Sequence, residues 1–178
     1  MSAHFQSSGP RSNAYSGSKF TNWTVYDPFF AEARAALKRF DGRISRVPTF
    51  PHIIVLRPQV PDFIHACRRA EVKVYLERMP AASRQGLRAV FLLAGTRKQE
   101  KSWSGSLGCY GMYWNSCVFL CAHPFHLRSG YTLDHLRRFY LDDVLVHEVA
   151  HHMDRERIAD QKAKEAFAHA FVQQQLRT

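Results

Sequence analysis

The segment 144–154 contains the residues whose types and spacing could do chemistry. His147, Glu148 and His151 form a His-Glu-x-x-His pattern. In an α-helix, residues four apart differ by about 40° around the axis, so the two imidazoles project from one face and can share a metal ion. Glu148 lies about 100° from His147, which keeps its carboxylate off the metal but close to a metal-bound water. This pattern predicts zinc hydrolysis chemistry with Glu148 as the general base.

The residues around this pattern indicate an amphipathic helix. The apolar run 144–146 precedes it, and Asp154 follows seven positions after His147, nearly on the same face. A carboxylate at that position could orient a liganding imidazole through its other ring nitrogen. His152 lies about 100° from His151 and is expected to face away from the metal.

The motif resembles that of the zincin metallopeptidases, whose shared signature is the His-Glu-x-x-His helix. The metzincin branch adds a glycine and a third histidine soon afterwards, whereas residues 152–155 of this chain read His-Met-Asp-Arg, so it is not a metzincin. The gluzincin branch takes its third zinc ligand from a glutamate on the following helix. Residues 164–171 read Lys-Glu-Ala-Phe-Ala-His-Ala-Phe and resemble the glutamate-bearing helix of the anthrax lethal factor protease domain. The resemblance covers roughly the last forty residues.

This resemblance implies that Glu165 is the third zinc ligand, beside His147 and His151. The short connection from His151 to Glu165 then requires a tight turn between two helices. His169 lies one turn after Glu165 on the same helical face, so it stays open as an alternative third ligand.

The resemblance also implies a mechanism and a substrate class. Zinc with three protein ligands keeps a fourth position for water, and Glu148 takes a proton from that water as it attacks a peptide carbonyl. The strand before the active helix, here 118–122, would bind an extended peptide or protein substrate as an added strand. A tyrosine or histidine is expected to stabilise the oxyanion, and the candidates are Tyr131, Tyr140, His126 and His169.

A second group of candidate metal ligands is formed by Cys121, His123 and His126, with Cys117 nearby. Cys117, Cys121 and His123 would share one face of a strand. The spacing matches no established zinc module, however, and the sequence favours buried thiols on a hairpin.

The elements that must position these residues follow from apolar periodicity and turn signals. Asp27 followed by Pro28 predicts the start of a helix, and the pair 115–116 (Asn-Ser) predicts a hairpin turn. We expect helices over 28–40, 61–79, 131–153 (with a bend near Tyr140) and 160–176, and strands over 53–56, 89–94, 110–114 and 118–122. This order predicts an α+β domain with a small mixed sheet packed against helices.

The composition limits the class of protein. The 178 residues suffice for one domain, and 46% hydrophobic with 22% charged residues excludes collagen, coiled coil and wholesale disorder. We expect residues 1–22 to be disordered and residues 23–178 to form one domain, zincin-like by the resemblance.

No apolar run approaches the ~20 residues of a membrane helix, so no membrane segment is expected. The four cysteines form no CxxC pair and no signal peptide is visible, which favours a cytoplasmic protein.

The net charge of the chain helps to choose between the candidate functions. A net charge of +10 suits an acidic partner, but the basic residues are scattered, so nucleic acid is a possible partner that is not favoured. The leading function is a small zinc-dependent endopeptidase acting on peptide or protein substrates. Two alternatives stay open, a protease directed to DNA-bound proteins and a non-catalytic binding or regulatory module on a zincin scaffold. Glu148 argues against the second, because a metal site with a purely structural role does not need the base.

Overall fold

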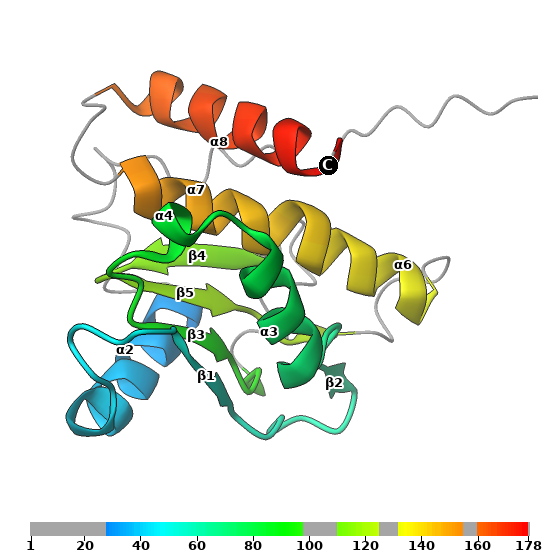
Figure 1. Ribbon diagram of the computed structural model, residues 1–178. Helices are drawn as coiled ribbons and strands as arrows, with labels where there is room; N and C mark the ends of the chain where they lie inside the picture. Colours follow the sequence, from blue (N-terminus) through cyan, green and yellow to red (C-terminus); the bar gives the residue numbers. More distant parts are fainter. Residues whose placement is uncertain (1–27, 98–109, 125–131, 155–159, 178) are drawn as a thin grey trace, which may run out of the picture.

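A four-stranded mixed sheet forms the centre of the computed structural model, which describes residues 28–97, 110–124, 132–154 and 160–177. Its strands are β1 (His52–Val55), β3 (Ala89–Leu92), β4 (Gly111–Trp114) and β5 (Cys117–Leu120). The strand order is β1–β3–β5–β4 (Figure 1). The first three of these strands run parallel, and β4 pairs antiparallel with β5 at one edge. The predicted α+β class with a small mixed sheet is therefore confirmed.

Helices and short elements complete the fold. In chain order they are α2 (Pro28–Phe40), η3 (Asp41–Arg43), β2 (Phe63–Ile64), α3 (Arg69–Arg78), α4 (Ala81–Arg84), β6 (His123–Pro124), α6 (Leu133–Arg138), the π-helix η5 (Phe139–Leu145), α7 (Val146–Asp154) and α8 (Gln161–Gln175). Strands β2 and β6 pair antiparallel in a separate sheet. Among the described residues, no helix has the length and apolar character needed to cross a membrane. Residues 1–22, for which disorder is predicted, lie outside the described residues.

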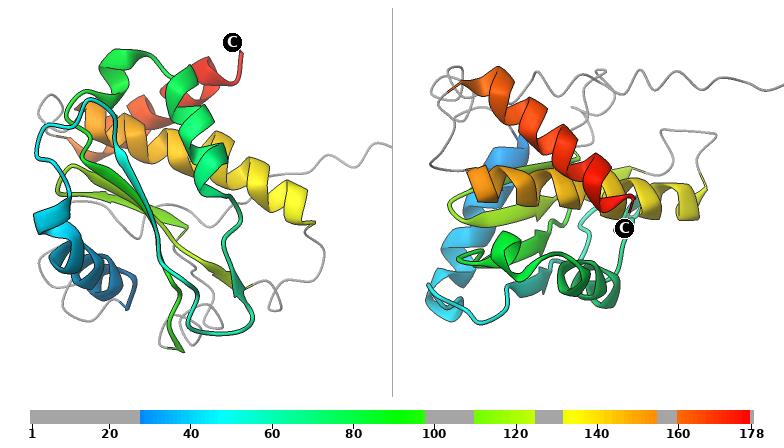
Figure 2. Two further views of the ribbon diagram at one scale, coloured as in Figure 1. Left: turned by 60° about the horizontal axis from the view of Figure 1, so that its bottom comes forward. Right: turned by 45° about the horizontal axis from the view of Figure 1, so that its top comes forward.

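The central strands β3 and β5 separate two apolar layers. Every residue of both strands is buried, and alternate residues of a strand point to opposite faces. Val90 and Val118 join the layer formed with α3, η5, α7 and α8. Phe91 and Phe119 join the layer formed with α2, where their rings stack with centroids 5.0 Å apart. Helix α2 and the α7–α8 pair therefore cover opposite faces of the sheet (Figures 1 and 2).

The hairpin between β4 and β5 turns at Asn115 and Ser116, as predicted. Both residues have positive φ angles, 50° and 57°, which is the backbone of a type I′ turn. This turn matches the right-handed twist of the two strands and sets a register in which Gly111 lies opposite Leu120.

A helical stretch runs from α6 through η5 into α7, where one helix over 131–153 is predicted (Figure 1). The side chain of Thr132 caps its start by accepting a hydrogen bond from the His135 N–H at 3.1 Å. Instead of the predicted bend, the chain widens into a π-helix at Phe139, and Tyr140 from this stretch is buried in the core. Such π-helical turns are rare and are frequent at functional sites. This one ends directly before α7.

The helix predicted over 61–79 is wrong in its first part. The helix α3 begins at Arg69, and the backbone N–H of Arg68 donates to the Glu71 carboxylate at 2.6 Å. The preceding residues Phe63–Ile64 pair with His123–Pro124 instead. A pairing with a strand so distant in sequence leaves no local signal.

The strand predicted to bind substrate is also not the edge of the sheet. Residues 118–122 belong to β5 and its continuation, and β5 is paired on both sides, with β3 and with β4. The edge strand on this side is β4. Its Gly111 packs against η5 and α7, because a Cβ there would lie 2.5 Å from Cγ1 of Val144 and 3.2 Å from Cγ of Glu148.

We expect Gly111→Ala to destabilise the protein by about 1–3 kcal/mol, since the added methyl group overlaps a branched side chain that cannot swing away freely. The free energy of unfolding in urea measures this effect. The double variant Gly111→Ala with Val144→Ala should lose less than the sum of its single variants, because the two changes remove a shared clash.

Gly42→Ala is the matched control. A Cβ at Gly42 meets nothing within 4 Å, so the change in unfolding free energy should stay within about 0.5 kcal/mol. Equal effects at the two glycines would contradict the close packing of β4 on α7.

Candidate metal centre

The packing of α8 on α7 positions the candidate site (Figure 2). Helix α8 starts at Asp160, whose carboxylate accepts a backbone hydrogen bond from the first turn at 3.0 Å. Ala168, Phe171 and Val172 follow helical spacing and are buried in the core. Glu165 lies one turn before Ala168, so its side chain enters the space between the two helices.

The predicted ligands His147, His151 and Glu165 meet in this space. The Nε2 atoms of the two histidines lie 3.0 Å apart. The Glu165 carboxylate lies 3.3 Å from Nε2 of His147 and 3.6 Å from Nε2 of His151. Donors about 2.0–2.1 Å from a tetrahedral zinc ion are about 3.3 Å from one another. The spacing of the three side chains, in which each histidine lies nearest a different oxygen of Glu165, is compatible with such an ion.

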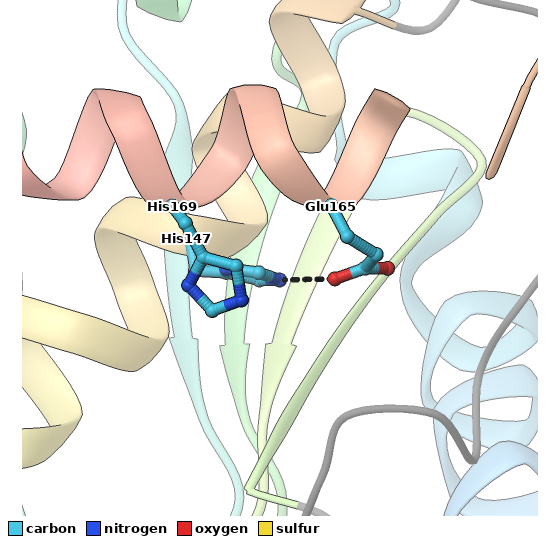
Figure 3. A group of neighbouring side chains, drawn as sticks. All are labelled: His147, Glu165 and His169. Atoms are coloured by element: carbon cyan, nitrogen blue, oxygen red, sulfur yellow. Dashed lines mark ion pairs between the residues drawn. The ribbon is translucent and has the colours of Figure 1, made fainter. Parts of the chain in front are cut away.

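His169, the alternative third ligand, lies at the same place. Figure 3 shows its imidazole pointing from α8 toward that of His147. The two ring centroids are 5.1 Å apart, and ligand atoms of His147, Glu165 and His169 all lie within 4.8 Å of one another. The structure therefore brings both candidates next to His147, and His147, Glu165 and His169 form a group that could hold a metal ion.

Glu148 lies on the side of α7 that faces the edge strand β4. Its side chain is buried and accepts a hydrogen bond from the backbone N–H of Tyr113. Gly111 gives it room, because a side chain there would crowd the Glu148 carboxyl group. Burial raises the pKa of Glu148 to about 7, although the neighbouring His147 opposes this shift. A carboxyl group with a pKa near neutrality can both accept and release a proton.

The two histidines of the motif differ in their preferred charge. Burial disfavours the charged form of His147, but its hydrogen bond with Glu165 and three nearby carboxylates outweigh burial and raise its pKa. At His151, burial dominates and the neighbouring His147 adds to it, so the pKa of His151 is lowered. A metal ligand must be a neutral imidazole. His151 already holds that form at neutral pH.

The contacts of three residues near the site were not predicted from the sequence. Asp143 interacts electrostatically with His147 and His169; partial burial, followed by the neighbouring Asp142, raises the pKa of Asp143. Its position four residues before His147 was an available signal, because such residues share a helical face. Gly111 and Tyr113 contact Glu148 from β4, and no local pattern marks a contact across that sequence distance.

His152 faces away from the ligand group, as predicted. Its Nε2 lies 2.9 Å from the backbone carbonyl of Gln85, and its Nδ1 lies 3.1 Å from the Tyr113 hydroxyl. A carbonyl can only accept, so Nε2–H donates to Gln85, and Nδ1 of the neutral ring accepts from Tyr113. His152 therefore ties the end of α7 to β4 and to the residue after α4.

The remaining predicted roles around the site differ in outcome. Asp154 is buried at the end of α7, and its role in orienting an imidazole stays a prediction. Tyr140, an oxyanion candidate, is 1% exposed and packs against the rings of Tyr110 and His123, and its role stays a prediction. The candidates Tyr131 and His126 lie outside the described residues.

The second group of candidate ligands is divided by the sheet. Cys117 and Cys121 are buried in the layer that faces α2, and burial raises the pKa of Cys117 to about 11. His123 lies near Tyr140, which belongs to the opposite layer. The interpretation of both cysteines as buried thiols is confirmed.

Comparison with protein-family models, with curated proteins and with solved structures finds no match to this chain. The resemblance to zincins therefore rests on the sequence motifs alone. These motifs lie on the same two helices, α7 and α8.

The adjacent histidines of α7 offer a direct test of the site. His151→Ala should weaken zinc binding at least about a hundredfold, because it removes a direct ligand. His152→Phe keeps the ring volume but removes the hydrogen bonds to the Tyr113 hydroxyl and the Gln85 carbonyl, so it should bind one zinc ion and lose about 0.5–1.5 kcal/mol of stability. Zinc titration and urea unfolding of the metal-free proteins measure the two effects. Loss of zinc binding in the His152 variant alone would contradict this assignment.

Proposed function

We propose that this chain is a zinc-dependent metallopeptidase of the zincin type, with His147, His151 and Glu165 as ligands and Glu148 as general base. The observation that carries the proposal is the meeting of three metal-donor side chains from two helices beside a buried carboxyl group. A purely structural metal site has no use for such a carboxyl group, whereas a hydrolytic site requires a base next to its ligands.

The donor set supports zinc and a hydrolytic reaction. Imidazole and carboxylate donors at tetrahedral spacing suit zinc. When bound, zinc lowers the pKa of a coordinated water to about 7 and polarises a carbonyl oxygen. Glu148 takes the proton of the attacking water and donates it to the amine that leaves. Its place on the β4 side of α7, apart from the three ligands, leaves its carboxyl group available for this transfer.

The position of β4 supports an extended peptide as the substrate. An edge strand presents main-chain groups with which a peptide can pair, and alternate side chains of that peptide then point toward the enzyme. Gly111 and Tyr113 of this strand contact Glu148. A peptide bound along β4 would thus have its backbone beside the base.

Replacement of Glu148 by Gln tests this function. The zinc-loaded variant should bind one zinc ion as the parent does, because Gln keeps the shape and Glu148 is not a ligand. Its kcat on a peptide library should fall by about a hundred- to ten-thousandfold, the usual contribution of a general base. Mass spectrometry of the products and zinc analysis of the same samples give both quantities.

Glu77→Gln is the matched control, since Glu77 is half-exposed on α3 and pairs with Lys73. It should leave both quantities unchanged. Full activity of the Glu148 variant would exclude its role as base. Zinc binding by the parent protein without cleavage of any library peptide would favour the non-catalytic module.

A further inference from the structure

His169 gives the metal centre one donor more than a hydrolytic zinc site uses. Its ligand atom lies within 4.8 Å of those of His147 and Glu165. To reach the ligand spacing of about 3.3 Å around a tetrahedral ion, it needs to approach these two donors by no more than about 1.5 Å, and it already interacts electrostatically with the third donor, His151. A rotation of the imidazole about its side-chain bonds covers such a distance.

We propose that His169 is a fourth, displaceable ligand of the same metal ion, so that the resting centre is closed by three imidazoles and the Glu165 carboxylate. This inference rests on the metal centre of the proposed function and adds a regulatory step to it. Four protein ligands are typical of closed zinc sites, whereas hydrolysis needs one open position. One of the four must therefore leave before a substrate is hydrolysed.

Exposure identifies His169 as the ligand that leaves. The side chains of His147, His151 and Glu165 are only 15%, 17% and 21% exposed and pack between the helices. His169 is exposed on α8. An exposed side chain regains rotamer freedom and hydration when it is released, so its displacement costs less than that of a buried ligand. Its imidazole leaves as an intact neutral group, and an oxygen donor takes its position.

The zinc environment of the full chain tests this proposal. X-ray absorption at the zinc edge should count three imidazoles in the parent protein and two in His169→Ala, with one oxygen donor gained. Zinc affinity should fall about tenfold in this variant, against at least about a hundredfold in Glu165→Ala. Gln173→Ala, an exposed position one turn further along α8, is the matched control and should keep three imidazoles.

Acetohydroxamate, a small oxygen-donor ligand for zinc, measures access to the fourth position independently of peptide cleavage. It should bind zinc-loaded His169→Ala about tenfold more tightly than the parent, because no protein ligand has to be displaced. Two imidazoles in the parent protein, or equal acetohydroxamate affinity in both proteins, would overturn the proposal. Peptide cleavage that depends on Glu148 would then still stand, so failure of this inference is distinguishable from failure of the proposed function.

Discussion

The candidate site depends on one packing contact, that of α8 against α7. Helix α7 brings two histidines to one face by its own geometry, but two donors do not hold an ion firmly. Glu165, the third donor, lies beside these histidines because the small side chain of Ala168 is fully buried and allows α8 to lie close to α7. With a larger residue at that position the helices would separate, and Glu165 would no longer lie 3.3 Å from His147. Burial of the Ala168 methyl group thus fixes the position of the Glu165 carboxylate, which lies one turn away.

Strand β4 packs against another side of helix α7. Burial of the Glu148 carboxyl group costs free energy, which the Tyr113 N–H offsets by a hydrogen bond. The tight turn at 115–116 sets the register that places Gly111 against α7, where no other residue fits without a shift of Val144. His152 adds a second tie, through the Tyr113 hydroxyl. The base and the edge strand are therefore positioned by one group of contacts.

The sequence predicted those features that depend on local spacing. The shared face of His147 and His151, the outward direction of His152 and the hairpin turn all follow from residues within one turn or one loop. It did not predict which strand forms the edge, because strand order depends on pairing with β1 and β3, far away in the sequence. A signal was nevertheless present: residues 118–122 are continuously apolar, as in a strand buried on both faces. The choice between Glu165 and His169 was equally beyond local spacing, since one helical turn separates them.

The proposed metal centre lies at the seam between α7 and α8, where it combines buried and exposed donors. Residues that point into the seam are fixed by packing on both sides, and residues at its rim keep contact with water. His147 and Glu165 belong to the first class, whereas the exposed His169 belongs to the second. In the proposed centre, burial rather than ligand type would set the order in which donors are released, because the imidazole of His151 is chemically the same as that of His169. In the proposed centre, the position that opens is therefore that of the exposed His169, on the solvent side of the two helices.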